Sequence, residues 1–203
     1  MCGRYALFTE DHDDRMQQMI RLCNDAAEDS QQISNQRDIS PGDHAPAIIC
    51  VSRKAMAVSM QWGFEREGGL LIHARSEDAA ERSTFRGLLQ AQRCVLPAAG
   101  YYEWRDRDHL RHIVTPSGHD ALYLTGLYRS DALGHFHFVI LTRNAYGPHA
   151  GIHGRMPCML FSREDARRWI SGVMPLEALR KDECEALDIT AQGFEQLCMD
   201  FDD

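Results

Sequence analysis

The segment RCVLPAAGYYEW, residues 93–104, contains the strongest indication of both the fold and a reactive group. Residues 94–97 have the apolar composition of a β-strand. Three small residues follow, and Tyr101, Tyr102 and Trp104 then surround Glu103. A half-buried carboxylate at such a strand end has a raised pKa and can transfer protons. An exposed glutamate beside structural aromatic residues is the alternative interpretation.

Short apolar runs on both sides of this segment predict a strand-rich core. The further strands are expected at residues 47–51, 56–62, 70–74, 112–115, 122–127 and 135–141. Helices are expected at 11–27, at 84–92 and after Ser162-Arg163-Glu164-Asp165, which resembles a capping box. Residues 29–42 are polar and predict a loop. The pattern favours one α+β domain over residues 1–203, with a mixed or antiparallel core and peripheral helices.

The composition is that of an ordinary soluble protein, with 44% hydrophobic and 26% charged residues among 203. No apolar run approaches the roughly 20 residues that span a bilayer, and the first residues lack the layout of a signal peptide. We therefore expect a cytoplasmic protein. Seven cysteines without CxxC spacing belong to a reducing compartment, which excludes a disulfide scaffold and disfavours a CxxC zinc site.

The net charge of −8 argues at first against a nucleic-acid partner. However, residues 175–203 contain nine acidic and two basic residues, so residues 1–174 carry a net charge of only −1. Arginine outnumbers lysine twenty to two. The planar guanidinium suits phosphate, so binding to DNA outside the acidic tail is compatible with this composition.

Cys2 is the most informative single residue. If the initiator Met1 is removed, Cys2 presents a free amine and a thiol on adjacent carbons, a 1,2-aminothiol. The unperturbed pKa is about 7.7–8.0 for such an amine and about 8.5 for the thiol, so both nucleophiles are partly available near neutral pH. This pair can attack an acyl carbon or condense with an aldehyde to a five-membered thiazolidine. A small residue that merely follows the start codon is the alternative.

Two pairs of polar residues complete the local candidates. His153 and Arg155 lie two positions apart in the loop-like segment Ile152-His153-Gly154-Arg155-Met156-Pro157, where both can face one cavity. His135 and His137 share a strand face, but two ligands without a third do not form a metal site. We expect no metal and no cofactor.

Taken together, these segments closely resemble the SOS-response-associated peptidase family, also called abasic-site processing proteins. The matching motifs, in order, are Met1-Cys2-Gly3-Arg4-Tyr5, His73-Ala74-Arg75-Ser76-Glu77, Phe85-Arg86, residues 93–104, Leu141-Thr142 and residues 152–157. The resemblance extends from Met1 to about Trp169. It implies a barrel-like core, a monomer, and a sensor of abasic sites in single-stranded DNA that forms a covalent DNA–protein crosslink and removes its own Met1. Its place would be the cytoplasm, on the nucleoid when bound to DNA.

The resemblance also implies roles for individual residues. Cys2 would be the nucleophile, Glu103 would move protons during ring opening and dehydration, and His153 would assist Schiff-base chemistry and crosslink reversal. Contacts to DNA are implied for Arg4, Arg75, Arg86, Thr142 and Arg155, and for the aromatic residues Trp62 and Trp104.

The chain departs from the family at two positions. His73 stands where the family usually has an asparagine that orients the amine and the opened sugar, and a histidine there can become charged. In addition, Phe64-Glu65-Arg66-Glu67-Gly68 follows Trp62-Gly63, where the family has a proline and a second tryptophan. We therefore expect His73 in the site, with altered pH dependence, and a different shape of the wedge that bends DNA.

Two other functions fit part of the sequence. Cys2 could serve as an N-terminal nucleophile for acyl transfer in a cysteine amidohydrolase or peptidase. Alternatively, the chain could be a non-enzymatic single-stranded DNA-binding module in which Cys2 is inert. Reaction with an oligonucleotide that contains an abasic site separates these hypotheses.

Overall fold

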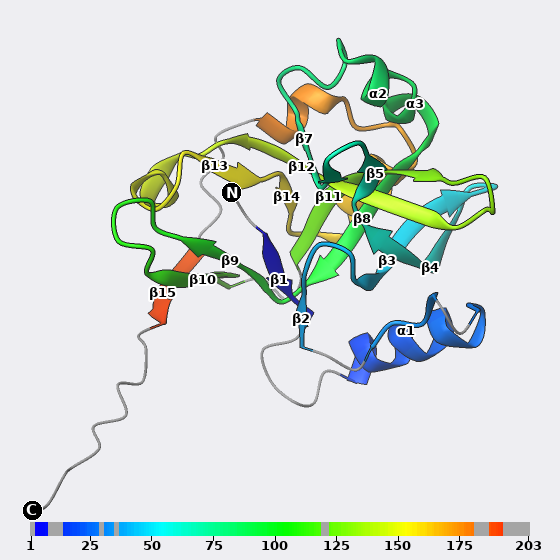
Figure 1. The fold of residues 1–203 in the computed structure, drawn as a ribbon, viewed down its shortest axis with the longest axis horizontal. Coiled ribbons are helices and arrows are strands. Elements are labelled where there is room, and N and C mark those ends of the chain that lie inside the picture. Colours follow the sequence, from blue (N-terminus) through cyan, green and yellow to red (C-terminus); the bar gives the residue numbers. More distant parts are fainter. Residues whose placement is uncertain are drawn as a thin grey trace, which may run out of the picture.

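Five strands close into a ring at the centre of the computed structural model (Figure 1). In spatial order they are β12 (Phe136–Asn144), β4 (Lys54–Trp62), β3 (His44–Val51), β8 (Arg93–Ala98) and β11 (Leu122–Ser130), which pairs again with β12. All these pairings are antiparallel except that of β12 with β4. The barrel-like, mixed core that the sequence predicts is therefore present in this ring.

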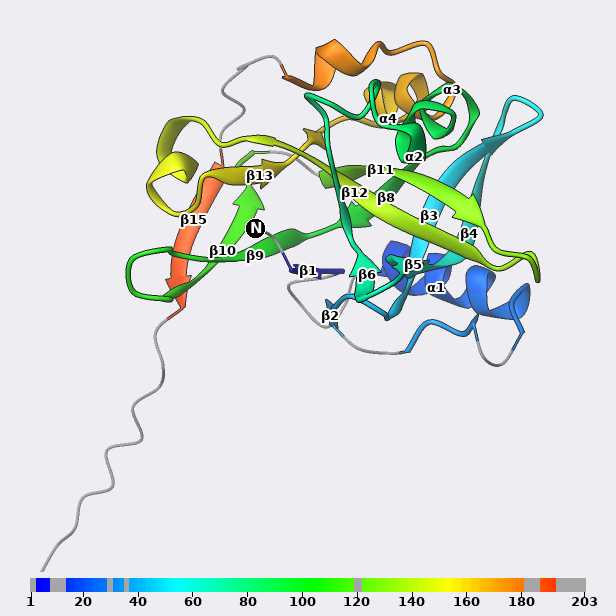
Figure 2. The same cartoon turned by 45° about the horizontal axis from the view of Figure 1, so that its top comes forward.

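A second sheet extends to one side of the ring (Figures 1 and 2). Its order is β15 (Leu187–Gln192), β10 (Arg111–Pro116), β9 (Gly100–Trp104), β1 (Arg4–Ala6) and β2 (Asp38–Ile39). The chain passes from the ring strand β8 into β9 through Ala99 alone, and the Ala99 N–H donates to the Ala6 carbonyl at 2.9 Å. The segment 93–104 thus connects the two sheets.

The structure describes residues 3–7, 14–28, 31–34, 37–118, 122–180 and 187–192. Its helices are α1 (Asp14–Asp25), α2 (Ser83–Arg86), α3 (Leu88–Ala91) and α4 (Arg163–Ile170), with 3₁₀ turns η2 (Gly147–Gly151) and η3 (Leu176–Arg180). The remaining strands are β5 (Phe64–Arg66), β6 (Gly69–Leu71), β7 (His73–Arg75), β13 (Arg155–Pro157) and β14 (Met159–Leu160). None of the helices described in these ranges is long and apolar enough to cross a membrane.

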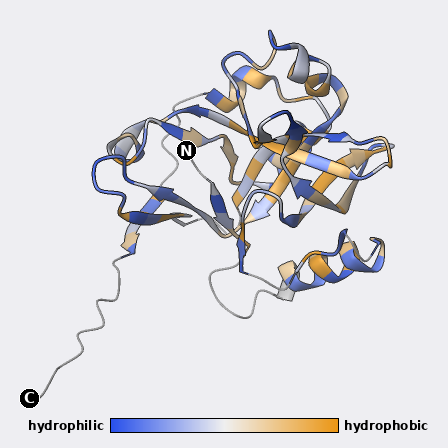
Figure 3. Ribbon diagram, viewed as in Figure 1, coloured by the Kyte–Doolittle hydropathy of each residue, from blue (hydrophilic) through white to orange (hydrophobic). Residues whose placement is uncertain are grey.

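Side chains alternate between two hydrophobic clusters along the ring strands. The ring strands contain many of the hydrophobic residues coloured orange in Figure 3. Phe138 and Ile140 of β12 belong to the cluster that also contains Tyr5 of β1, whereas Val139 and Leu141 pack with Trp169 of α4. Both faces of β12 are therefore buried, which explains why its sequence is an almost continuous apolar run.

Most predicted elements are present, and the differences have local causes. Ser162 caps α4 as predicted, because its Oγ accepts a hydrogen bond from the Asp165 N–H at 3.0 Å. The helix predicted at 84–92 is divided into α2 and α3 at Gly87, and the run 70–74 forms β6 and β7 on either side of Ile72. The segment predicted as a loop at 29–42 contains β2, and the acidic tail contributes η3 and β15. β2 is only two residues long, and β15 has the mixed polar sequence LDITAQ, so neither forms the apolar run that predicts a strand.

Candidate functional site

The first described residues of the chain run beside the strand that contains Glu103. Arg4 of β1 lies opposite Tyr102 of β9, and Tyr5 lies opposite Tyr101. Met1 and Cys2 lie outside the described residues, so the geometry of the predicted nucleophile is not among them. The pairing of β1 with β9 nevertheless places Arg4–Ala6 beside the three residues that precede Glu103.

Glu103 is buried, with 1% of its surface exposed. Side chains of a strand alternate between the two faces of a sheet, so Glu103 shares its face with Tyr101, and with His112, which lies opposite it on β10. His112 is also buried, and its Nδ1 lies 2.9 Å from the Leu110 carbonyl oxygen. Burial raises the pKa of the Glu103 carboxyl because the charged form loses water, while positive charge on His153 acts in the opposite direction. The predicted half-buried carboxylate is thus fully buried.

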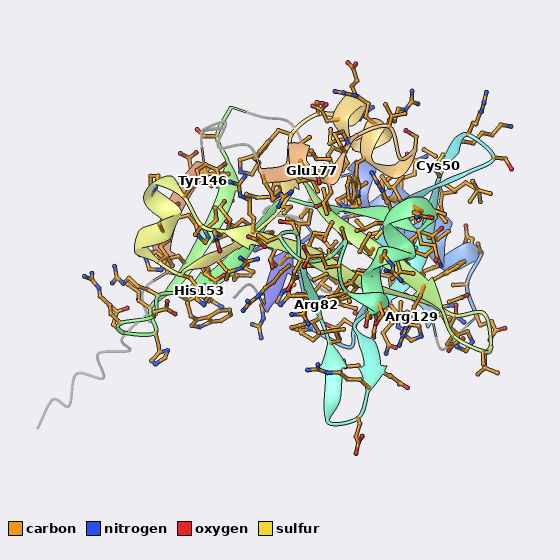
Figure 4. All side chains as sticks on the ribbon, turned by 90° about the horizontal axis from the view of Figure 1, so that it is seen from above. Cys50, Arg82, Arg129, Tyr146, His153 and Glu177 are labelled. Atoms are coloured by element: carbon orange, nitrogen blue, oxygen red, sulfur yellow. The ribbon has the colours of Figure 1, made fainter. Side chains whose placement is uncertain are left out.

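His153 lies in the turn between η2 and β13 and is half-buried (Figure 4). The Arg155 backbone N–H donates to its Nδ1 at 2.9 Å. In the neutral imidazole Nδ1 is then the acceptor, and the ring proton is on Nε2. His153 Nε2 lies 3.5 Å from Oδ1 of Asp106, whose own N–H donates to the Ile152 carbonyl. This arrangement fixes the ring and leaves Nε2 as its proton-carrying atom.

His149 of η2 is a buried neighbour that the sequence did not indicate. Its ring centroid lies 5.6 Å from that of Tyr101, and only 1% of the residue is exposed. Burial, and then the charge of His153, lower the pKa of His149 to about 4, so this imidazole is neutral at neutral pH. Among the described residues neither ring nitrogen has a hydrogen-bond partner. A lone histidine between Pro148 and Ala150 has no distinguishing sequence pattern.

Arg155 is held by a carboxylate from a distant part of the chain. Its Nη1 and Nη2 donate to the two Glu77 carboxylate oxygens at 2.8 and 2.9 Å. Nη1 also donates to Asn144 Oδ1 at 2.6 Å, and Nη2 to Thr142 Oγ1 at 3.1 Å. Burial opposes ionisation of Glu77, but the hydrogen bonds from Arg155 and from the Asn144 backbone lower its pKa to about 2. A phosphate at Arg155 therefore has to compete with an ionised Glu77.

His73 and Arg75 lie on β7, which runs parallel to β12. Arg75 is opposite Thr142 and is exposed, whereas His73 is half-buried and shares its face of the strand. The His73 ring meets Trp62 edge-on, with centroids 6.2 Å apart. His73 and Arg75 thus lie on the same face of β7, next to β12.

Trp62 is completely buried and does not present a surface for stacking. Its Nε1–H donates to the Ile72 carbonyl at 3.1 Å, and its ring stacks on Phe138 at 6.0 Å. Thr142 is also fully buried. In this structure Trp62 supports His73 and Thr142 positions Arg155, and neither buried side chain is accessible for a direct contact with DNA.

The other predicted DNA contacts lie on accessible surfaces. Alternation places Arg4 and Trp104 on the face of the second sheet opposite to Glu103, where both are partly exposed. Arg86 ends α2 and is exposed. Within the described ranges, no three histidine, cysteine, aspartate or glutamate side chains are grouped so that they could hold a metal ion.

The whole chain is similar to known proteins in sequence and in fold. It matches the family model "SOS response associated peptidase (SRAP)" over residues 1–191. Two proteins of Bacillus subtilis strain 168 named abasic site processing protein, YoqW and YobE, are 26% and 27% identical to it over 185 residues. The alignments cover 84% of this chain and 80% and 82% of those proteins.

Two crystal structures share the fold. A protein from Bacteroides thetaiotaomicron superimposes with a TM-score of 0.69 at 19% identity, over 94% of this chain and 91% of that one. A phage-related protein from Bordetella bronchiseptica does so with a TM-score of 0.67 at 23% identity, over 94% of both chains. With the family match over nearly the full length, the chain belongs to the SOS response associated peptidase family.

Proposed function

We propose that this protein captures abasic sites in single-stranded DNA as a covalent crosslink through Cys2. The proposal is supported by family membership and by relatives that are named abasic site processing proteins. The observation that carries it is the buried Glu103 on β9, directly beside the strand that follows Cys2.

Covalent geometry restricts where the nucleophile can be. Consecutive Cα atoms are about 3.8 Å apart, so the Cα of Cys2 is within about 7.6 Å of the Cα of Arg4. Arg4 pairs with Tyr102, the residue before Glu103. In this proposal the amine and thiol of Cys2 reach the Glu103 carboxyl group, whose pKa is raised by burial.

The chemistry needs an aldehyde, which an abasic deoxyribose supplies when its ring opens. The amine of Cys2 adds to the carbonyl carbon to give a carbinolamine, which loses one water to form an imine. The Cys2 sulfur then bonds to the imine carbon, the thiol proton goes to nitrogen, and a thiazolidine ring closes. A protonated Glu103 can protonate the departing hydroxyl group, and general acid catalysis of this kind typically accelerates a reaction about 10²–10⁴-fold.

In this proposal His153 is a second group that transfers protons, in addition to Glu103. The Arg155 N–H donates to Nδ1 and so fixes the orientation of the ring. The other nitrogen, Nε2, can then exchange a proton with the imine, both when the crosslink forms and when it reverses. Arg4 and Arg75 hold phosphates, as does Arg155 once a phosphate displaces Glu77. Removal of Met1, which exposes the amine, completes the proposal.

The test uses an oligonucleotide with one abasic site and a denaturing gel without borohydride. Wild-type protein should give a heat-stable shifted band, and Cys2→Ala should give none. Cys50→Ala is the matched control because Cys50 is a partly exposed thiol elsewhere in the fold. Intact-mass measurement of the same sample should show loss of Met1. Equal bands for wild type and Cys2→Ala would exclude the thiazolidine, because a band that survives denaturation without the Cys2 thiol requires a covalent bond from another residue.

A further inference from the structure

A basic pocket of about 570 Å³ opens beside His73 and Arg75. Three further arginines line it: Arg66 from β5, Arg82 from the turn before α2, and Arg129 from β11. Glu65 is the one carboxylate among its lining residues. Figure 4 labels Arg82 and Arg129, which lie near the base of the β5–β6 hairpin. The positive charges of the four arginines make the pocket suitable for an anion.

Arg129 is held over the Phe64 ring in the wall of this pocket. Its guanidinium carbon lies 4.4 Å from the centroid of the Phe64 ring, and its Nη2 donates to the Glu65 carbonyl at 3.1 Å. Phe64 is itself only 1% exposed, so the ring is a fixed base for the guanidinium. A planar guanidinium that is already stacked on one side can stack a nucleobase on its other side with little loss of side-chain entropy.

Arg66 and Arg75 provide positive charge that no carboxylate of the described residues offsets. Both are exposed, and within the described ranges neither forms an ion pair with a carboxylate. Arg82 differs, because Asp78 lies 2.8 Å from its Nη2 and offsets part of its charge. Arg75 also belongs to the motif that contains His73, so the pocket is continuous with the site described above.

We propose that this arginine pocket (Arg66, Arg75, Arg82 and Arg129) binds one nucleotide of the single strand next to the captured abasic site. Arg66 and Arg75 hold its phosphodiester, and Arg129 stacks on its base. The inference rests on the proposed function, and it assigns a nucleotide subsite to the segment Phe64-Glu65-Arg66, where the sequence departs from its family.

The experiment measures binding of an undamaged single strand as a function of salt. Arg66→Ala should reduce the slope of log K against log salt by about 0.7, the value for one lost phosphate contact on a single strand. Arg129→Ala should weaken binding about fivefold or more, as expected for loss of one stacked base. Arg129→Lys should keep the wild-type slope but not the affinity, because lysine retains the charge and lacks the plane.

Arg53→Asn is the matched control. Arg53 is an exposed arginine in the turn between β3 and β4, with φ of 66°, a conformation that asparagine tolerates. This variant should bind as the wild type does. Equal slopes for Arg66→Ala and wild type, or equal affinities for Arg129→Ala and wild type, would overturn the subsite.

Two further readouts separate the possible failures. If wild-type protein forms no adduct with the abasic oligonucleotide, the proposed function fails. The salt dependence of binding to the undamaged strand still tests the subsite in that case. Thermal shift with inorganic phosphate, on wild type and on Arg66→Ala, distinguishes DNA from a free anion. Stabilisation by phosphate that Arg66→Ala abolishes, together with unchanged DNA binding, would show a free-anion site and contradict the proposal.

Discussion

Burial and pairing shift the pKa values of three side chains in opposite directions. Burial raises the pKa of Glu103, where the charged form is the anion, and lowers the pKa of His149 to about 4, where the charged form is the cation. Desolvation also opposes ionisation of Glu77, yet its pKa falls to about 2 because Arg155 holds its anion with two hydrogen bonds. At the residue scale, then, hydrogen-bond partners decide whether a carboxyl group near this site is an acid or a fixed anion.

Glu103→Gln should stabilise the protein and slow capture. In the unfolded chain the carboxyl ionises near pH 4.5, whereas the folded state keeps its proton to higher pH. Between pH 4.5 and the higher pKa of the folded state, the folded state binds more protons than the unfolded state. The free energy of unfolding of the wild type therefore falls as pH rises through this range. The variant should therefore melt at a higher temperature than wild type at pH 8 and at the same temperature at pH 4. Each 1 kcal/mol corresponds to about 2–4 °C for a chain of this size.

The same variant should form the adduct at least about 100-fold more slowly, because an amide cannot donate the proton. Glu81→Gln, at an exposed position, is the control and should leave both measurements unchanged. A lower melting temperature for Glu103→Gln at pH 8 would show that the buried carboxylate stabilises the fold, contrary to the upward shift of its pKa.

His149→Phe should make the fold less sensitive to acid. The pKa of His149 falls from 6.5 to about 4 on folding, so the unfolded state binds the proton first as pH decreases. Stability of the wild type is thus lost as pH falls from about 6.5 to about 4. Phenylalanine retains the contact with Tyr101 and cannot be protonated. Melting temperatures between pH 7 and pH 4 should therefore fall less steeply for the variant.

His109→Asn is the control for this series, because His109 is exposed and has φ of 56°, which asparagine accepts. It should follow the wild-type curve. If His149→Phe followed that curve as well, protonation of this ring would not limit acid stability.

At the scale of elements, β9 positions Glu103 because it is paired on both edges. β1 holds one edge and β10 the other, and β10 is covered in turn by β15. Gly100 begins β9, and an added Cβ there would be 2.7 Å from the Val114 carbonyl oxygen and 2.9 Å from Thr115 Cγ2 of β10. The lack of a side chain at Gly100 therefore sets the separation of these two strands.

Gly100→Ala should both destabilise the protein and reduce capture. The methyl group meets backbone, which has to move, and overpacking of this kind costs about 1–3 kcal/mol. The shift would displace Glu103 relative to β1, so adduct formation should fall together with the melting temperature. Gly154→Ala is the control, since a Cβ there meets nothing within 4 Å. Unchanged capture by Gly100→Ala would show that the spacing of β9 and β10 does not matter to the site.

At the scale of the whole molecule, charge is separated between a basic surface and an acidic end of the chain. Four arginines line the pocket beside His73, whereas residues 193–203 contain four acidic and no basic residues. A net charge of −8 opposes association with DNA at a distance, although the four arginines give the pocket itself a positive charge.

Neutralising the four carboxylates, with Glu195→Gln and Asp200→Asn, Asp202→Asn and Asp203→Asn, changes the net charge from −8 to −4. The variant should bind single-stranded DNA more tightly at low salt, because less repulsion opposes association. The difference should vanish near 1 M salt, where the screening length is about 3 Å. Measuring affinity across this range tests the prediction, and identical low-salt affinities would contradict it.

The sequence by itself determined the features that depend on local pattern. The ring strands follow from apolar runs, and α4 follows from the Ser162 cap, because these signals act between residues a few positions apart. Glu103 can be selected as a candidate for the same reason, because the aromatic residues beside it and the apolar run before it are local features of the sequence. The family, too, follows from short motifs in order.

The tertiary structure alone decided which distant residues meet. Arg155 and Glu77 are 78 positions apart, and no local pattern shows that a predicted phosphate ligand already has an anionic partner. Likewise β1 and the two edge strands of its sheet, β2 and β15, make their hydrogen bonds to segments far along the chain. The burial of Trp62 and the position of His149 against Tyr101 also depend on how the two sheets pack. Burial and pairing are properties of surroundings that several segments build together, so they set the pKa values and the accessible surface only once the chain has folded.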